Sequence, residues 1–315
     1  MRTGWRRFLA FAAIAACGIA PISRGMHGSD GVVLGTRPGY GPAAVSAVPN
    51  RAAMDRFLWV PGLNEGWNPQ GLAAVGGSLL ISAYRSEHFG VNRGPCRVFR
   101  IDPVNGGETG HFDVPPPCGH AGGLAYAGAG ELYIADTHTL FEVNLAGAFR
   151  DPLPAFRSFA LGPGLKGALA ASESSAVWIG TYEEDRPGRI FKFDRAVLDR
   201  LADGAVLSED LASTTQTIPA YAQGAAVAAS GELWVSRSEI AWGALDELDI
   251  AGGRAVRRYA VPGGIEGISF DDAGRMWAVS EAGARHNRWI SPFFPVIFRL
   301  DLGRLQPSGW GVSGQ

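Results

Sequence analysis

One unit of apolar and polar segments occurs five times along the chain. The clearest copy runs from Gly264 to Glu281, where an apolar stretch, a polar turn and a second apolar stretch follow one another. The other copies are Pro69 to Ile81, Ala121 to Ile134, Leu165 to Ile179 and Ala222 to Val235. Short apolar runs bounded by turn residues are typical of β-strands. Each copy therefore predicts two antiparallel strands joined by a short turn.

A glycine opens the first strand of every copy. These glycines recur about every 43 to 57 residues, a spacing typical of propeller blades and solenoids. They are Gly71, Gly123, Gly167, Gly224 and Gly267. A third apolar segment follows each pair of strands, and a fourth follows in all copies except the last.

The fourth strand that the last copy lacks has a counterpart near the N-terminus. The segment from Arg56 to Val60, followed by Pro61-Gly62, matches the pattern of Arg258 to Val261, followed by Pro262-Gly263. A strand from one end of the chain that completes the last blade leaves no open sheet edge. We therefore predict an all-β fold, a single five-bladed β-propeller of four-stranded blades closed by this N-terminal strand, with six blades as the alternative.

The start of the chain predicts export. Within residues 1–17, three arginines precede a short apolar run, Phe8 to Ala16, that is too short to span a bilayer. Ile14 to Cys17 resembles the bacterial lipobox, in which the cysteine (here Cys17) is lipidated. We expect a protein that is either secreted or anchored to the outer face of the bacterial membrane, and that touches the membrane only through this lipid.

The rest of the chain divides into three parts. Residues 18–51 are rich in Gly, Pro, Ala and Ser and predict a flexible tether, residues 52–305 form the propeller, and residues 306–315 are a C-terminal tail. With 315 residues, of which 46% are hydrophobic, the chain can bury a substantial core. Its formal charge of −2 gives no indication of a nucleic-acid partner. We expect a monomer.

Two cysteines lie within the predicted propeller. Cys96 opens the third strand of the first blade and Cys118 follows its fourth strand, so antiparallel pairing brings both to one rim. In an exported protein this arrangement predicts a disulfide bond between Cys96 and Cys118. The alternative is a pair of free thiols.

One rim of the predicted propeller gathers most of the ionisable residues. The first strand of a blade begins at the rim where the second strand ends, so side chains at both positions converge on one mouth of the central channel. At the starts of first strands lie Gln70, His120, Lys166, Gln223 and Glu266, and at the ends of second strands lie Tyr84, Arg85, Asp136, Tyr182, Arg237 and Glu281. The opposite turns consist of small residues. This asymmetry predicts a polar pocket that binds a small molecule or glycan.

Specific roles follow from residue type. We assign His120, Glu266 and Lys166 as candidate catalytic residues, and Glu266 with Asp136 as candidate metal ligands. The candidate ligand-binding residues are Gln70, Tyr84, Arg85, Tyr182, Gln223, Arg237 and Glu281. Structural roles are the alternative: Glu266 can form an ion pair with Arg85 or Arg237, and Asp136 can accept hydrogen bonds from backbone amides.

The segment from Glu266 to Ser280 resembles the repeat of gluconolactonase (senescence-marker) and strictosidine-synthase-like propellers, and also NHL-type repeats. In the gluconolactonase family, a glutamate before a glycine at the start of a first strand binds a divalent metal, and Glu266-Gly267 matches that element. The resemblance implies a divalent cation such as calcium. The family has six blades, whereas this sequence has five repeat copies.

Two functions remain open at this stage. The first is an exported hydrolase or lactonase-like enzyme, in which a cation on Glu266 or Asp136 polarises a carbonyl group and His120 is the general base. The second is a non-catalytic propeller that binds a small molecule, glycan or peptide at the same rim. No catalytic sequence motif decides between them.

Overall fold

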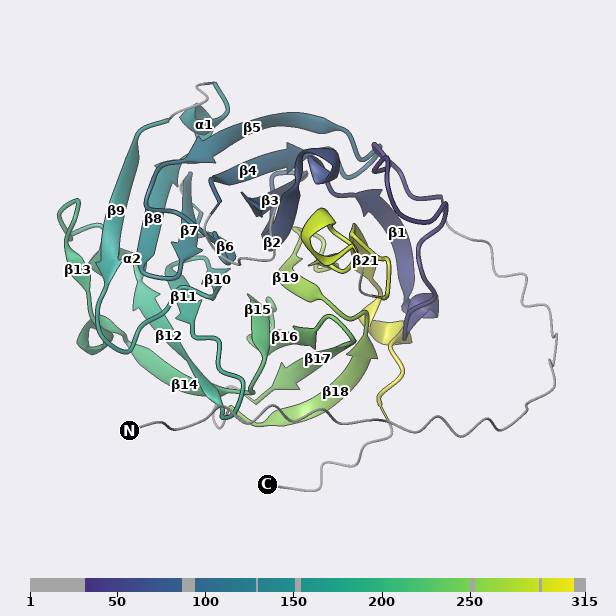
Figure 1. The fold of residues 1–315 in the computed structure, drawn as a ribbon. Coiled ribbons are helices and arrows are strands. Elements are labelled where there is room, and N and C mark those ends of the chain that lie inside the picture. The colour runs from purple at the N-terminus through teal and green to yellow at the C-terminus, as the bar shows by residue number, and fades with distance from the viewer. Residues whose placement is uncertain are drawn as a thin grey trace, which may run out of the picture. The chain divides into compact units, whose positions relative to one another are not determined.

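The computed structural model describes residues 32–86, 94–128, 130–150, 154–249, 253–288 and 291–308. These residues form five antiparallel sheets arranged in a ring around one axis (Figure 1). The predicted five-bladed β-propeller is therefore confirmed. Cys17 and the predicted export signal lie outside the described residues.

The chain builds each blade from the axis outward. The first blade comprises β2 (Trp67–Val75), β3 (Ser78–Arg85), β4 (Cys96–Ile101) and β5 (Glu108–Val114), and the second comprises β6 (Gly123–Tyr126), β7 (Glu131–Asp136), β8 (Thr139–Asn144) and β9 (Phe156–Leu161), with β13 (Val206–Leu207) added in parallel to β9. The third comprises β10 (Leu169–Glu173), β11 (Ala176–Gly180), β12 (Gly188–Asp194) and β14 (Thr214–Ile218), and the fourth comprises β15 (Ala222–Val227), β16 (Leu233–Glu239), β17 (Trp242–Leu248) and β18 (Ala255–Val261). The fifth comprises β19 (Ile265–Phe270), β20 (Met276–Ser280), β21 (Val296–Leu300) and β1 (Met54–Trp59).

The helices are short connections between strands. They are α1 (Leu145–Ala148), α2 (Arg195–Leu198) and the 3₁₀ turns η1 (Arg51–Ala53), η2 (Leu63–Glu65), η3 (Glu209–Leu211), η4 (Arg285–Asn287) and η5 (Leu302–Arg304). Within the described ranges, none has the length and apolar character that a membrane-spanning helix needs.

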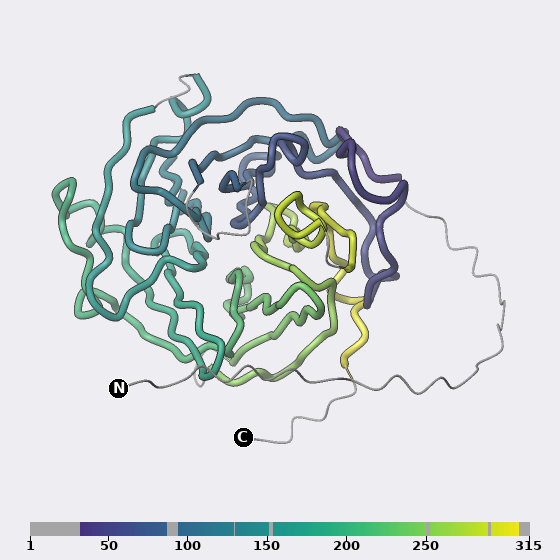
Figure 2. The backbone as a smooth tube through the Cα atoms, in the orientation of Figure 1, coloured from purple at the N-terminus to yellow at the C-terminus, as the bar shows by residue number. Residues whose placement is uncertain are grey.

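The glycines that open the inner strands allow neighbouring blades to touch through their backbones. Figure 2 shows the inner strands arranged closely about the axis. A β-carbon on Gly71 of β2 would lie 2.6 Å from the Leu124 nitrogen of β6, and one on Gly267 of β19 would lie 2.7 Å from the Gln70 oxygen of β2. Neither approach leaves room for a side chain. The repeated glycine is therefore a packing requirement of the ring.

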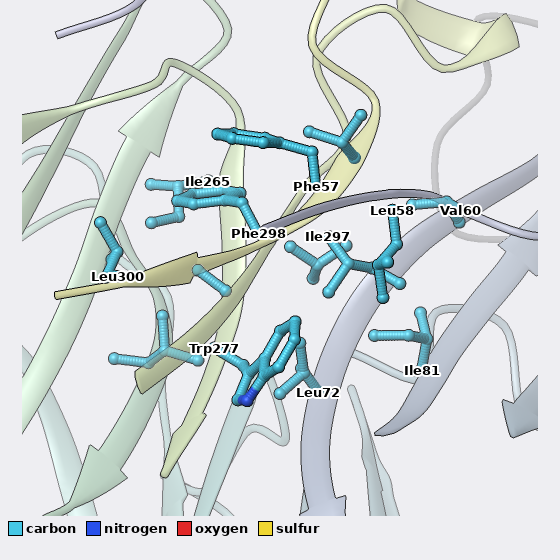
Figure 3. Packing of buried hydrophobic residues seen from close by; sticks show 14 of the residues in the cluster. Phe57, Leu58, Val60, Leu72, Ile81, Ile265, Trp277, Ile297, Phe298 and Leu300 are labelled. Carbon is cyan, nitrogen blue, oxygen red and sulfur yellow. The ribbon is translucent and has the colours of Figure 1, made fainter. Parts of the chain in front are cut away.

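Strands from the two ends of the described chain share the fifth blade. β1 pairs antiparallel with β21, so that Phe57 lies opposite Phe298 and Leu58 opposite Ile297. These side chains join one buried hydrophobic cluster with Trp277 of the same blade (Figure 3). The outer edge of the last blade is thus occupied by a strand that precedes all the others in sequence.

Part of the segment predicted to be a tether lies against this blade. The Leu34 amide donates to the Phe57 carbonyl oxygen, and the Leu34 carbonyl oxygen accepts from the Trp59 amide, so Leu34 covers the outer edge of β1. The Tyr40 ring packs edge-on against Phe293, with centroids 6.4 Å apart. Leu34 and Tyr40 therefore contact the propeller although they precede the predicted boundary at residue 52, because a short apolar segment can pair with an exposed strand edge.

We expect the fold to require β1. A chain that starts at Leu63 loses Phe57, Leu58 and Trp59 from the core and leaves β21 as a bare edge, so it should unfold or aggregate. Thermal melting and size-exclusion chromatography measure this. A matched chain that starts at Gly31 keeps β1 and Leu34 and should melt as the full chain does. A stable monomer that starts at Leu63 would contradict the role assigned to β1.

We also expect Gly267→Ala to lower stability strongly. The added methyl group meets the backbone of β2, which cannot move without shifting the first blade, so the free energy of unfolding should fall by about 1–3 kcal/mol. Gly147→Ala in α1 is the control, since a β-carbon there meets nothing within 4 Å. Urea unfolding of both variants compares them, and equal midpoints would refute the close-approach argument.

Candidate functional site

Two glutamates, the buried Glu266 and the half-buried Glu281, lie at one mouth of the ring. Glu266 is the second residue of β19 and is 3% exposed, and Glu281 immediately follows β20, the partner strand of β19. Both line a pocket of about 440 Å³. The other lining residues are Tyr182, Gln223, Ser238, Glu239, Ile240 and Ala241.

The strand pairing is irregular at the start of three inner strands, and the residues that gather at this mouth lie at these irregularities. The register shifts between Pro69 and Leu72 in β2, between Ala222 and Gly224 in β15, and between Ile265 and Ile268 in β19. Gln70, Gln223 and Glu266 fall within these irregularities. A β-bulge changes the direction of a side chain at the end of a ladder, and we attribute the gathering of these three residues to it.

The surroundings of the two glutamates raise the pKa of both carboxyl groups. Burial, followed by the charge of Glu281, raises the pKa of Glu266 well above its ordinary value. Burial raises the pKa of Glu281 to about 7, and this shift is opposed by hydrogen bonding from Asn287 and Gln70. The Gln70 Nε2 donates to the Glu281 Oε2 at 3.0 Å. Burial therefore favours the protonated form of both carboxyl groups, and the charge of Glu281 further opposes ionisation of Glu266.

Tyr84 and His120 form a layer beside the glutamates. Burial, and then the charges of Glu281 and Glu266, raise the pKa of the buried Tyr84 hydroxyl. The His120 ring packs edge-on against Tyr84, with centroids 5.4 Å apart. Burial lowers the pKa of His120 to about 4, although Asp136 opposes this shift, so the imidazole is neutral. His120 is not among the described residues that line the pocket, which does not support its predicted role as general base.

Asn68 offers an unused oxygen near the pair. It is completely buried on β2, the inner strand next to β19, and neither polar atom of its side chain has a hydrogen-bond partner among the described residues. Carboxylate and amide oxygens are the ligands that calcium prefers. Asn68, Glu266 and Glu281 offer side-chain oxygens of this kind on neighbouring inner strands or next to them, which is the chemistry that the predicted cation requires.

Asp136 has a structural role. Its Oδ1 accepts hydrogen bonds from the backbone amides of Gly119 at 3.1 Å, His120 at 2.7 Å and Ala121 at 2.9 Å. It also lies 3.6 Å from the Cys118 Sγ, which donates to it. Asp136 thus holds the loop that precedes β6, as the structural alternative proposed. These three amides occupy the Asp136 Oδ1, which leaves Glu266 as the predicted metal ligand that lines the pocket.

The two cysteines lie together as thiols. The Cys96 and Cys118 sulfurs and an Asp136 oxygen are all within 4.8 Å of one another, and all three residues are buried. The predicted convergence of the cysteines is therefore seen, but the predicted disulfide bond is absent from the structure. The Cys118 thiol is instead used as a donor to Asp136.

The three basic residues assigned to the pocket do not line it in the described part of the chain. Lys166 is exposed, and its Nζ lies 3.8 Å from the Glu183 Oε1. Arg237 turns into the fourth blade, where its Nε donates to the Ala220 carbonyl oxygen at 2.7 Å and its Nη1 lies 3.2 Å from the buried Asp246 Oδ2. Arg85 is exposed at the end of β3. The inward position of Arg237 is explained by the buried Asp246, because a carboxylate left unpaired there would destabilise the fold.

The predicted residues that do gather around Glu266 are Gln70, Tyr182, Gln223 and Glu281. Ser238 and Glu239 also line the pocket but were not assigned to it. Both lie at the end of β16, a second strand, so the positional argument that selected Glu281 also selects them.

No family model and no curated protein matches this sequence. Among solved structures, Myxococcus xanthus glutaminyl cyclase is similar with a TM-score of 0.52 and 12% identity, over 81% of this chain and 96% of that one. A luciferin-regenerating enzyme gives a TM-score of 0.47 and 11% identity, over 76% and 92% of the two chains. The calcium-binding protein regucalcin of Agrobacterium tumefaciens gives 0.43 and 17%, over 77% and 91%. The similarity to the glutaminyl cyclase shows a shared fold alone.

The acidity of Glu281 predicts an effect on stability. Because its pKa rises from 4.5 to about 7 on folding, its favourable contribution is complete below pH 4.5 and is lost as the pH rises through 7. Glu281→Gln removes the carboxylate charge, so it should raise the free energy of unfolding at pH 8 by on the order of 2 kcal/mol and leave it nearly unchanged at pH 4.5. Urea unfolding at the two pH values tests this. An equal effect at both would contradict the raised pKa.

Proposed function

We propose that this protein is a hydrolase of lactone or ester bonds that acts on a small molecule at the mouth of the propeller. The observation that carries the proposal is that Glu266 and Glu281 both line one pocket and that the pKa of each is raised. Perturbed carboxyl groups in a pocket are typical of catalytic acids and bases.

The two glutamates can divide the proton transfers of hydrolysis between them. Glu281, oriented by Gln70, takes a proton from water as the oxygen of that water attacks the substrate carbonyl carbon. Glu266 then gives its proton to the leaving oxygen as the carbon–oxygen bond breaks. The proton on Glu281 returns to Glu266 through solvent, which restores the starting state. Glu281 replaces His120 as the general base in this scheme.

Other lining residues can orient the substrate. Tyr182 and Gln223 lie on the pocket wall, and the Gln223 Nε2 is 3.4 Å from the Ser238 carbonyl oxygen, which leaves its amide oxygen as an acceptor for substrate. The basic and apolar start of the chain supports an exported location, secreted or lipid-anchored at Cys17, for this activity.

We expect the activity to depend on both glutamates and on pH. Hydrolysis of a panel of γ- and δ-lactones and aryl esters, followed by proton release, should rise with an apparent pKa near 7 as Glu281 loses its proton. Glu281→Gln and Glu266→Gln should each lower kcat/KM by on the order of 10²-fold or more. Glu232→Gln, on the opposite turn, should have no effect.

Two results would overturn the proposal. Full activity in both glutamate variants would show that the pair is not catalytic. A folded wild-type protein that binds panel members without turnover, with or without added calcium, would identify a non-catalytic binding propeller.

A further inference from the structure

The charged side chains that line the pocket are all acidic in the described part of the chain. Three carboxyl groups, from Glu239, Glu266 and Glu281, line the pocket, and among the described residues no lysine or arginine does. The nearby basic residues are engaged elsewhere, since Lys166 pairs with Glu183 and Arg237 pairs with Asp246. A pocket of this kind repels an anionic ligand and attracts a cationic one.

The side chain of Glu266 is almost completely buried, and the pocket is the space that its carboxyl group borders. Glu266 is 3% exposed and lines the pocket, yet no hydrogen bond or ion pair to its carboxyl oxygens occurs within the described ranges. Buried polar groups in proteins are nearly always paired, and an exception needs an explanation. A ligand with hydrogen-bond donors supplies that partner.

One aromatic residue lines the same space, and two further rings support it. Tyr182 lines the pocket, and its ring contacts Tyr221 edge-on at 6.4 Å. Tyr221 in turn contacts Trp242 edge-on at 5.4 Å, and the Trp242 Nε1 donates to the Glu239 Oε2 at 3.2 Å. This array holds Tyr182 and Glu239 beside each other. A π-face next to a carboxylate is a favourable surface for an organic ammonium ion.

We propose that the substrate carries an alkylammonium group, which Glu239 and Tyr182 bind at the rim while its reactive bond lies against Glu266 and Glu281. This inference rests on the proposed function for the reaction, but the ammonium preference is a property of binding alone. Glu239 is exposed at the end of β16, so it contributes specificity rather than proton transfer.

Calorimetric titration of the full chain with a cationic, a neutral and an anionic four-carbon compound tests the preference for an ammonium group. n-Butylammonium, n-butanol and butyrate share a carbon chain and differ in the charge of the head group. We expect n-butylammonium to bind at least about tenfold more tightly than n-butanol, and butyrate to bind most weakly. Glu239→Gln should weaken n-butylammonium binding about threefold to tenfold without changing n-butanol binding. Glu232→Gln is the control.

Each other outcome decides against the proposal. Equal affinity for the three compounds removes the ammonium preference. Binding of calcium by chelator-treated protein, with no binding of n-butylammonium to that metal-free protein, assigns the acidic lining to a metal instead. Failure of the proposed hydrolysis is distinguishable, because a protein that prefers n-butylammonium but hydrolyses nothing retains this inference and loses only the reaction.

Discussion

The close approach of the inner strands is the constraint on which this structure depends. Gly71, Gly224 and Gly267 each lie where a β-carbon would meet the backbone of the next blade or a side chain packed against it. The contact from Gly267 to β2 is the one that joins the last blade to the first. Because the chain has only backbone at these points, the blades stand close enough to enclose a small pocket at one mouth.

The same glycines position the chemistry. The residue before each one reaches the rim, and in β2, β15 and β19 the strand pairing is irregular there. Gln70 then contacts Glu281, and Gln223 and Glu266 line one pocket. Lys166 precedes Gly167 in the same way, but β10 begins only at Leu169, and the lysine stays at the surface. A shared position in the repeat therefore produces a shared site only where the strand itself extends to the rim.

Burial of acidic groups connects stability with the proposed activity. A carboxyl group held away from water resists ionisation, so Glu266 and Glu281 retain protons at pH values where exposed glutamates are charged. Elsewhere the fold neutralises its buried acids. Asp246 is enclosed by Arg237 and Arg258, and Asp136 by three backbone amides. Glu266 differs from Asp246 and Asp136 because it lines the pocket without such partners, as expected for a residue that binds a ligand.

The sequence by itself determined the five blades, their four-stranded order and the rim at which polar residues collect. The period of the glycine-led repeat and the alternation of short apolar runs carry that information, since both reflect local strand geometry. Only the tertiary structure decided which polar residues face the pocket. Arg237 pairs with Asp246 on the next strand, Asp136 accepts hydrogen bonds from the loop before β6, and His120 packs edge-on against Tyr84. Such choices depend on contacts between residues of different strands and blades, which no local pattern records.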